Sequence, residues 1–574
     1  MATVAENIVR SLRANGIQRV YGIPGDSLNG FTDALRKDGS IRWVHVRHEE
    51  TAAFAAAADA ALTGDLAVVA GSCGPGNLHL INGLFDANRS RVPVLAIAAH
   101  IPTVEIGTGY FQETHPQELF RECSVYTEYV ADPKQMPRLL EIAMRAAIEQ
   151  RGVAVLVIPG DVALAEIEDD RAVKIPQTQP VVTPSGAELD EAARLLNAAK
   201  KVTILAGAGV EGAHDEVVVL ADRLGAPVVH ALRGKEFIEY DNPYDVGMTG
   251  LLGFASGYRA MEAADALLIL GSDFPYTQFY PDHATTIQVD IRGAQLGKRH
   301  PLDLGLVGDV KDTVDALLPR LAVKGDRAHL DDATAHYRKT RAKLDELAVP
   351  ARSGQPIHPQ YLARLVSDAA ADDAVFTADV GSPTVWAARY LTMTAGRRLI
   401  GSFTHGSMAN ALLHGIGAQA AAPARQVVAL AGDGGLTMML GELISLTQNR
   451  LPVKTIVINN SSLNFVELEM KAAGFVNYGT ELINPDFAAV AQAMGIFARR
   501  VERSEDLPDA VAEVFAHDGP ALLDVVTERQ ELSMPPTITA EQVKGFALYA
   551  IRTVMSGRGD ELLDLARANW RQLF

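Results

Sequence analysis

Apolar runs alternate with helix-like segments along most of this chain. The runs 66–70, 92–99 and 153–159 are short, aliphatic and bounded by turn residues, which is typical of buried strands. The segments between them carry apolar residues at helical spacing. Strands that alternate with helices predict parallel, doubly wound sheets. We therefore expect an α/β protein with three doubly wound parallel-sheet domains, followed by an amphipathic helical tail.

Two polar stretches separate the predicted domains. Residues 174–185 are polar and proline-rich, which is typical of a linker. Residues 323–355 are charged and helical and end in a second stretch rich in proline and glycine. At ~150 residues per domain, a chain of 574 residues holds about three or four domains. The predicted divisions are 1–178, 186–335, 350–530 and a tail of 531–574.

The stretch from residue 427 to residue 465 carries the strongest signal for a ligand site. One apolar run ends in Gly432-Asp433-Gly434, a helical segment follows, and a second apolar run ends in Asn459-Asn460. A right-handed crossover makes the two strands parallel, so Asp433 and Asn460 lie just past strand carboxyl ends, where α/β sheets bind ligands. A carboxylate and an amide oxygen beside glycine-rich turns suit Mg²⁺ that holds a diphosphate. The alternative is that both are ordinary turn residues.

Charge and cysteine content narrow the class of protein. The net charge of −18 argues against nucleic acid as a partner and against simple electrostatic binding to anionic lipid. Cys73 and Cys123 are too few for a disulfide framework or a zinc cluster. The N-terminus lacks a basic segment followed by an apolar core, and no run approaches the ~20 apolar residues of a membrane span. We expect a cytoplasmic protein that could still contact a membrane.

The two strand-end motifs resemble the diphosphate-binding motif of thiamine-diphosphate-dependent enzymes. The resemblance covers essentially the whole chain and implies a pyrimidine-binding first domain and a diphosphate-binding third domain. It implies thiamine diphosphate and Mg²⁺ as cofactors, with Asp433, Asn460 and the backbone carbonyl of Ser462 as the metal ligands. The residues implied to bind the cofactor in the third domain are Gly406, Ser407, Met408, Asp433, Gly434, Gly435, Asn460, Ser461, Ser462, Leu463, Asn464, Phe465 and Val466.

The segment Arg47-His48-Glu49-Glu50 enters a predicted helix, where two acids in the first turn are an ordinary feature. The resemblance instead matches Glu50 to the glutamate that bonds the cofactor's pyrimidine ring and relays a proton. In this family that glutamate and the diphosphate motif meet across a subunit interface, which implies at least a dimer and commonly a tetramer. Met408 is either core filler or the family's apolar wedge beneath the thiazolium ring. The glycine-rich turn 71–77 resembles the loop beneath the cofactor.

Several residues match family positions around the substrate. Phe111, Gln112 and Glu113 match residues that surround it, and Ser27 falls near its carboxylate. Phe465 matches an aromatic position implicated in movement and electron transfer in quinone-linked members. Glu469 is a candidate for acid–base work, with an exposed surface carboxylate as the alternative.

The middle domain contains three segments at predicted strand ends. Residues 207–212 fit G-x-G-x-x-G, a weak signal without a long helix that opens from the third glycine. The later segments resemble the FAD-binding segments of pyruvate oxidases and ubiquinone-dependent pyruvate dehydrogenases. The alternative is a vestigial or ADP-binding module. The residues implied to bind FAD are Thr249, Gly250, Leu251, Leu252, Ser272, Asp273, Phe274, Pro275, Tyr276 and Asp290.

The C-terminal tail is amphipathic. Residues 539–542 fit a capping box, a helix with one apolar face follows, and 561–574 form a second amphipathic piece. From residue 539 onward the net charge is +1, whereas the rest of the chain carries −19. The tail is either a terminal helix docked on its own protein or an anchor on a phospholipid surface. It resembles the lipid-binding terminus of the ubiquinone-dependent enzymes.

These resemblances together imply a peripheral membrane flavoenzyme on the cytoplasmic face of the cell membrane. It would decarboxylate pyruvate oxidatively to acetate and CO₂ and pass electrons through FAD to a membrane quinone. One alternative is a soluble carboligase of the acetolactate synthase type, in which FAD is structural. Another is a catalytically silent, membrane-associated partner subunit.

Overall fold

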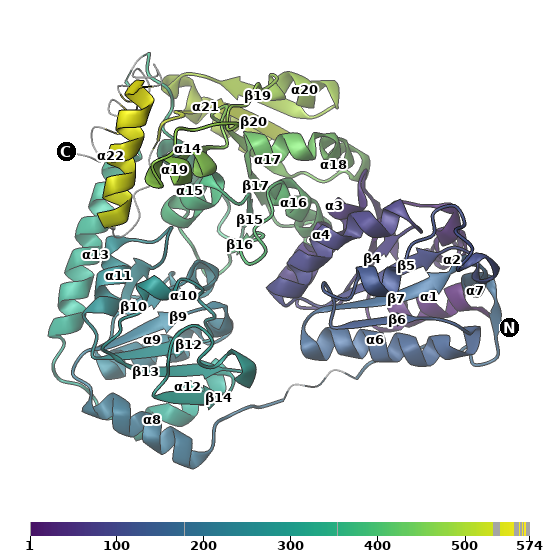
Figure 1. Cartoon of the computed structure of the whole chain (residues 1–574), viewed down its shortest axis with the longest axis horizontal. Helices are drawn as coiled ribbons and strands as arrows, with labels where there is room; N and C mark the ends of the chain where they lie inside the picture. Colours follow the sequence, from purple (N-terminus) through teal and green to yellow (C-terminus); the bar gives the residue numbers. More distant parts are fainter. Residues whose placement is uncertain are drawn as a thin grey trace.

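The computed structural model describes residues 2–176, 178, 180–352, 354–531 and 540–555, together with residues 562, 565, 568 and 569. Its core consists of three six-stranded sheets, each of them parallel throughout, with helices on both faces (Figure 1). The predicted fold class is therefore confirmed. Short apolar strands that are covered on both faces explain why each run lacks the alternation of a half-exposed strand.

The first domain has strand order β3-β2-β4-β5-β7-β6, and a small antiparallel pair, β1-β8, lies beside it. The three strands predicted in this domain correspond to β4, β5 and β7. Its strands are β1 (Ala2–Thr3), β2 (Arg19–Gly22), β3 (Arg42–His45), β4 (Ala67–Gly71), β5 (Val94–His100), β6 (Tyr126–Tyr129), β7 (Val153–Pro159) and β8 (Glu166–Ile167). Its helices are α1 (Val4–Ala14), α2 (Asn29–Asp38), α3 (Glu49–Thr63), α4 (Pro75–Ser90), α5 (Pro116–Leu119), α6 (Met136–Gln150) and α7 (Gly160–Leu164).

The middle domain has strand order β11-β10-β9-β12-β13-β14, and α13 runs from it toward the third domain (Figure 1). Its strands are β9 (Val202–Ala206), β10 (Val228–His230), β11 (Asp245–Met248), β12 (Ala266–Leu270), β13 (Thr285–Asp290) and β14 (Leu304–Val307). Its helices are α8 (Gly186–Ala198), α9 (His214–Leu224), α10 (Lys235–Ile238), α11 (Ala255–Glu262), α12 (Val310–Leu317) and α13 (Ala328–Leu347).

The third domain has strand order β16-β15-β17-β18-β20-β19. Its strands are β15 (Val375–Ala378), β16 (Arg398–Ile400), β17 (Val427–Gly432), β18 (Lys454–Asn459), β19 (Phe497–Val501) and β20 (Ala521–Val526). Its helices are α14 (Pro359–Ala369), α15 (Ser382–Tyr390), α16 (Asn410–Ala421), α17 (Asp433–Met438), α18 (Leu443–Asn449), α19 (Asn464–Ala472), α20 (Phe487–Ala493) and α21 (Leu507–Ala516). Because β17 and β18 are parallel neighbours, their two carboxyl ends meet at one edge of the sheet.

The first and third domains share one hydrophobic core, which centres on α3 and α16. Alanine makes up much of α3, and its buried face lies directly against α16. A Cβ atom added at Gly417 of α16 would lie 2.0 Å from the carbonyl oxygen of Ala55. Small residues therefore allow the two helix backbones to approach closely, which fixes the first domain against the third.

The tail helix α22 (Ala540–Met555) lies against α19 (Figure 1). A Cβ atom at Gly545 would lie 1.8 Å from the carbonyl oxygen of Ala472, and Arg552 donates to the carbonyl of Gly474 at 2.6 Å. The first residue of the predicted capping box and most of the second amphipathic piece lie outside the described residues. Within the described ranges, every helix falls short of the length and apolar character that crossing a bilayer requires.

Candidate functional site

Asp433 occupies the centre of the loops that follow β17 and β18. Its side chain is buried, with Oδ2 accepting from the backbone N–H groups of Asn460 at 3.1 Å and Ser461 at 2.6 Å. The side-chain amide of Asn484 donates to the same oxygen at 2.8 Å. Burial raises the pKa of Asp433, and these hydrogen bonds act in the opposite direction. The two loops of the predicted motif therefore converge on one carboxylate, as the parallel register requires.

The wedge segment 406–408 reaches the same loops. A Cβ atom on Gly434 would lie 2.9 Å from a methyl group of Leu463 and 3.4 Å from Cε of Met408. Gly406 has a φ of +89° and Ser461 a φ of +55°, so both loops turn sharply through the left-handed region. Met408 is thus placed beside the glycine turn, which favours the wedge interpretation over simple core filling.

The donor atoms at these loops fit a magnesium diphosphate. Asp433, the amide oxygen of Asn460 and the carbonyl of Ser462 are hard oxygen ligands of the kind that Mg²⁺ prefers. The ligands from Asn460 and Ser462 belong to one tight turn, because Asn460 Oδ1 lies 3.1 Å from the backbone nitrogen of Ser462. Within the described ranges, no group of three or more His, Cys, Asp or Glu side chains is arranged for a metal, so an ion at this site would depend on amide and carbonyl oxygens.

Sequence reasoning missed Asp379, which joins the wedge segment to the glycine turn. Its Oδ1 accepts from the backbone N–H of Ala411 at 2.9 Å, and its Oδ2 accepts from that of Gly432 at 3.0 Å. A Cβ atom on Gly435 would lie 2.2 Å from Oδ2, so only glycine fits there. Burial raises the pKa of Asp379 to about 6. A single aspartate after β15 gives no sequence signal, because its role depends on contacts between loops far apart in the chain.

The two acids at the start of α3 face different neighbours. Glu50 accepts from the amide of Asn82 at 2.8 Å, and the same amide lies 3.1 Å from Ser407 Oγ of the third domain. Glu49 is buried, with its Oε2 2.9 Å from His79 Nδ1. Its Oε1 would lie 3.1 Å from a Cβ atom on Gly76. The structure thus places Glu50 beside the wedge segment and Glu49 beside the glycine-rich turn. Sequence reasoning passed over Glu49, although it directly follows His48 in the same motif.

The predicted substrate residues gather around that turn. Ser27 Oγ lies 2.9 Å from Ser72 Oγ and accepts from the backbone N–H of Cys73 at 3.0 Å. The thiol of Cys73 donates to Gln112 Oε1 at 3.3 Å. Phe111, by contrast, is 77% exposed. Ser27 and Gln112 therefore share one site with Glu49, and Phe111 lies on the exposed loop beside it.

Helix α19 starts at the diphosphate loop. Phe465 packs against the core of the third domain close to Gly381, and Val466 is half-exposed. The side chain of Glu469 is exposed, and partial desolvation raises its pKa. The charge of Glu469 contributes to raising the pKa of Tyr276, so this acid faces the middle domain. The first turn of α19 therefore lies between the diphosphate loop and a predicted FAD segment.

The predicted FAD segments lie together at the carboxyl edge of the middle sheet. A Cβ atom on Gly250, whose φ is +94°, would lie 2.8 Å from the ring of Phe274. Residues 251–252 continue this loop, and Pro275 and Tyr276 continue the other. A Cβ atom on Gly207 would lie 2.4 Å from the carbonyl oxygen of Gly271, which brings the weak glycine motif to the same place.

Buried polar groups at this edge are consistent with a bound cofactor. Thr249 is buried, and its hydroxyl has no hydrogen-bond partner among the residues that the structure describes. Ser272 and Asp290 are also buried, and burial raises the pKa of Asp290. Arg91 of the first domain lies 3.6 Å from Asp273. An unpaired hydroxyl, a buried carboxylate and a nearby cation suit the ribose and diphosphate of a dinucleotide.

Three family models match most of the chain. Residues 2–119 match the N-terminal TPP binding domain of thiamine pyrophosphate enzymes, residues 189–317 match their central domain, and residues 379–525 match their C-terminal TPP binding domain. Each match falls on one of the three parallel-sheet domains. The third match contains Asp379, Asp433 and Asn460.

Several proteins are similar over nearly their whole length. The "Putative thiamine pyrophosphate-containing protein YdaP" of Bacillus subtilis (strain 168) is 35% identical over 572 residues, which cover 99% of this chain and 98% of that protein. A pyruvate oxidase of Lactiplantibacillus plantarum is 31% identical and covers 90% of this chain and 87% of its own length. The acetolactate synthase large subunit of Corynebacterium glutamicum is 30% identical, with coverage of 97% and 92%.

Proposed function

We propose a function for this chain from one established premise, namely that the chain belongs to the thiamine pyrophosphate enzyme family. Relatives at similar identity include a pyruvate oxidase and acetolactate synthases, so the family alone leaves the reaction open. The proposed reaction is the oxidative decarboxylation of pyruvate. Pyruvate, water and a membrane quinone give acetate, CO₂ and the quinol.

The cofactor proposal follows from the donor atoms at each sheet edge. Asp433, Asn460 and the carbonyl of Ser462 would hold Mg²⁺ and the diphosphate, and Met408 would support the bent cofactor. Thiamine diphosphate, when bound, supplies a carbon nucleophile and an electron sink for decarboxylating a 2-oxo acid. FAD would lie along Thr249–Leu252 and Ser272–Tyr276, where the buried hydroxyl of Thr249 lacks a partner among the described residues.

Two carboxylates, Glu49 and Glu50, are candidates for the proton relay at the pyrimidine ring. Glu50 is the family match drawn from the sequence, and it is bonded to the amide of Asn82. Glu49 is more buried, has the ionisable partner His79, and faces the turn shared with Ser27 and Gln112. A relay acid benefits from low solvent exposure and from a partner that exchanges protons. We therefore place Glu49 in this role and keep Glu50 as the alternative.

The main support for the quinone-linked reaction is that α22 packs against α19. Tyr549 is buried, and Lys471 of α19 lies 5.5 Å above its ring. The face of α22 that adjoins this contact leaves Leu548 40%, Ile551 59% and Met555 82% exposed. A helix with one face on the cofactor-binding domain and an apolar face toward solvent is suited to an interfacial lipid contact. The proposal is a peripheral protein of the cytoplasmic membrane face, in which lipid draws α22 away from α19.

Anaerobic reduction of the flavin tests the reaction itself. The purified holoenzyme is mixed with pyruvate in the absence of oxygen, and the yellow flavin absorbance is followed while acetate is measured. Bleaching with equimolar acetate supports oxidation. The rival carboligase, favoured by the acetolactate synthase relatives, predicts acetolactate without bleaching. A protein that does neither would support the catalytically silent subunit.

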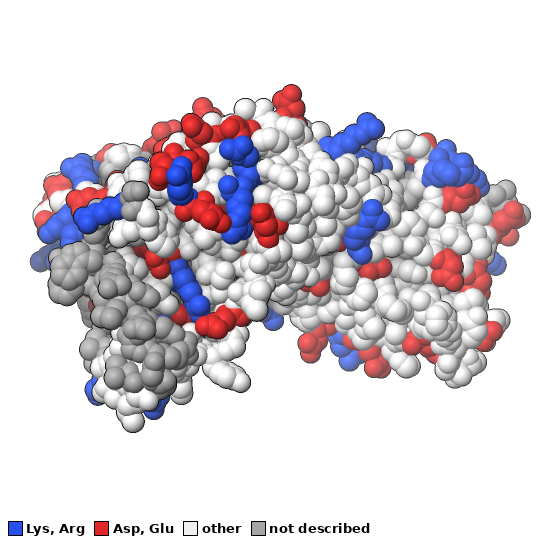
Figure 2. Space-filling model, turned by 90° about the horizontal axis from the view of Figure 1, so that it is seen from above, with Lys and Arg blue, Asp and Glu red and all other residues white. Residues whose placement is uncertain are grey.

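The proposed assembly is a homo-oligomer, with a dimer as the minimum. Val104 and Phe111 are 81% and 77% exposed in the single chain, which is unusual for large apolar side chains on one loop. On the face seen in Figure 2, an expanse with few charged side chains occupies the middle of the molecule. A second copy that covered this loop would also enclose the substrate cluster beside it. Sedimentation of the purified chain as a monomer at micromolar concentration would contradict this part of the proposal.

A further inference from the structure

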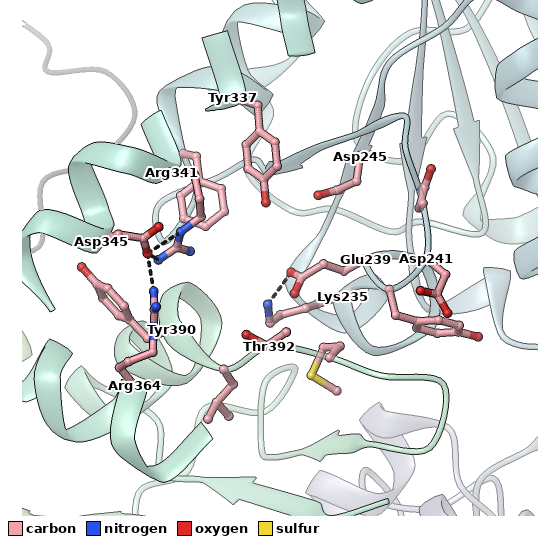
Figure 3. A pocket seen from close by; sticks show the side chains of 15 residues that line it. Lys235, Glu239, Asp241, Asp245, Tyr337, Arg341, Asp345, Arg364, Tyr390 and Thr392 are labelled. Carbon is pink, nitrogen blue, oxygen red and sulfur yellow. Dashed lines mark hydrogen bonds and ion pairs between the residues drawn. The ribbon is translucent and has the colours of Figure 1, made fainter. Parts of the chain in front are cut away.

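A cavity lies between the middle and third domains. It has a volume of about 520 Å³, which is within the usual range for small-molecule sites. Its walls come from α10, the start of β11, helices α13 and α14 and the segment after α15 (Figure 3). The predicted thiamine and flavin residues do not line it. It is therefore separate from the site described above.

One wall of the cavity carries excess positive charge. Arg341 donates to Asp345 Oδ1 from Nε at 3.0 Å and from Nη2 at 2.9 Å, and Arg364 donates to the same oxygen. Both guanidinium groups therefore share one oxygen of one carboxylate, as Figure 3 shows. The two arginines carry one positive charge more than Asp345 balances. This charge lies at the cavity, because each arginine keeps about a third of its side chain exposed or slightly less. A second carboxylate fits this fork geometry.

The facing wall is acidic, and His230 lies behind its carboxyl groups without lining the cavity. His230 is fully buried, and its Nε2 lies 3.5 Å from Asp245 Oδ1 and 3.6 Å from Glu239 Oε2. That nitrogen has no hydrogen-bond partner among the described residues. Burial lowers the pKa of His230 to about 4, so the ring is neutral, and its other nitrogen lies 3.3 Å from the carbonyl of Ala231. Nε2 therefore faces two carboxyl groups.

The donors present on this wall leave the acceptors unbalanced. Lys235 pairs with Glu239, and Asp245 accepts from the backbone N–H of Gly247 at 3.3 Å and from the Tyr337 hydroxyl. Burial and the neighbouring Glu239 raise the pKa of Asp245, which shows how poorly a negative charge is compensated there. The exposed Asp241 adds a further acid at the rim. A compact group with several N–H donors would satisfy Glu239 and Asp245 together, and an ammonium has three.

We propose that this cavity binds a small zwitterion, with its ammonium at Glu239 and Asp245 and its carboxylate at Arg341 and Arg364. A simple anion would satisfy only the arginine wall, and a simple amine only the acidic wall. A metal ion is a poor fit, since Lys235 already places a cation on Glu239 and no metal-type cluster occurs among the described residues. The binding site does not depend on the reaction proposed above.

Helix α15 connects the cavity to the cofactor sites. Tyr390 lines the cavity, and the adjacent Arg389 donates to the carbonyls of Leu252 at 3.1 Å and Gly253 at 3.3 Å in a predicted FAD segment. At the other end of the same helix, Ser382 donates to Asn464 at 2.8 Å, at the start of α19. A ligand that shifted the C-terminal end of α15 would therefore act on both cofactor regions through one rigid element.

Calorimetric titration of the full-length holoenzyme tests the proposal. The probes are glycine, β-alanine and γ-aminobutyrate, which carry both charges at increasing separation, with acetate and methylamine as single-charge controls. At least one zwitterion should bind about tenfold more tightly than either control. If acetate or methylamine binds as tightly as the best zwitterion, or if none of the three zwitterions binds, the proposal is wrong.

Variants on each wall locate the bound probe. Arg364→Gln and Glu239→Gln should each weaken the best zwitterion by about tenfold or more. Arg338→Gln, an exposed position on the same helix as Arg341, is the matched control and should bind normally. Gln112→Ala, at the substrate cluster, should also bind normally. If Gln112→Ala abolishes binding while Arg364→Gln retains it, the probe occupies the substrate site, and the proposal that the cavity binds it is wrong.

Discussion

At the scale of single residues, the sharpest question is which acid of α3 relays the proton. Glu49→Gln keeps a hydrogen-bonding side chain toward His79 but cannot carry a proton. We expect it to lower kcat by a factor of about 10² to 10⁴ and to leave flavin binding intact, because general acid–base catalysis supplies about that much. Glu50→Gln keeps an acceptor for Asn82 and should lower kcat by less than about tenfold. Steady-state kinetics with pyruvate at saturating thiamine diphosphate measure both, and the reverse ranking would establish Glu50 as the relay.

Asp379 should make the free energy of unfolding depend on pH, and the direction of its pKa shift fixes the sign of that dependence. The folded protein holds the pKa of this carboxyl at about 6, above the ordinary 3.8. Between these values the folded state binds more protons than the unfolded state, so this group's contribution to stability is lost as pH rises through about 6. The free energy of unfolding of Asp379→Asn, relative to wild type, should increase by about 2.4 kcal/mol from pH 4 to pH 7. Apparent unfolding temperatures at each pH measure it, and parallel pH profiles for the two proteins would contradict it.

The substrate and wedge residues mark how far single positions can be predicted. Asp433 and Asn460 could be placed from the sequence, because each directly ends an apolar run and parallel strands bring such ends together. The direction of a side chain at a helix start could not be read in the same way. Glu49 and Glu50 are adjacent, yet one faces the first domain's turn and the other faces Ser407 of the third. That difference depends on how α3 packs against α16. The local sequence pattern carries no information about this packing.

At the scale of elements, the docking of α22 depends on one glycine. A Cβ atom on Gly545 would lie 1.8 Å from the carbonyl oxygen of Ala472, so Gly545→Ala must displace α22 from α19. The substitution raises helix propensity, so loss of docking would not reflect loss of helix. We expect trypsin to cleave after Arg552 about tenfold faster, which corresponds to about 1.4 kcal/mol of docking free energy. Ala547→Ser, on the exposed face of α22, is the control.

The same variant separates docking from its proposed consequence. If α22 restrains α19, Gly545→Ala should also need less phospholipid for full quinone reductase activity. Faster cleavage with an unchanged lipid requirement would keep the docking contact and refute the gating. Unchanged cleavage would show that the contact between Gly545 and Ala472 does not hold the helix in solution.

Elements were predictable where burial alone defines them. The run at 153–159 coincides with β7, and the runs at 66–70 and 92–99 became β4 and β5 with shifts of one or two residues, because strands covered on both faces must be continuously apolar. The segment between β17 and β18 was predicted as one helix, but it divides into α17 and α18 around the 3₁₀ turn Leu440–Glu442. There Glu442 is buried and accepts from the backbone N–H of Arg47 at 2.9 Å, a contact between domains that overrides helical spacing.

At the scale of the whole molecule, the two sides of α3 suggest how subunits meet. Glu50 faces the third domain of its own chain, whereas Glu49 faces the turn beside the exposed loop of Phe111. A second copy that covered this loop could bring its own diphosphate loops to Glu49. In such a dimer each active site would combine Glu49 of one chain with Asp433 of the other.

Mixing two inactive variants tests that arrangement. Glu49→Gln and Asp433→Ala would each be inactive alone, since each removes one half of every site. Random exchange at equal amounts makes half of the dimers hybrids, and one of the two sites in each hybrid is intact. We therefore expect about a quarter of wild-type activity to return after mixing and exchange. Sites built within a single chain would return none, because every Glu49 that remained would then share its site with the altered Asp433 position.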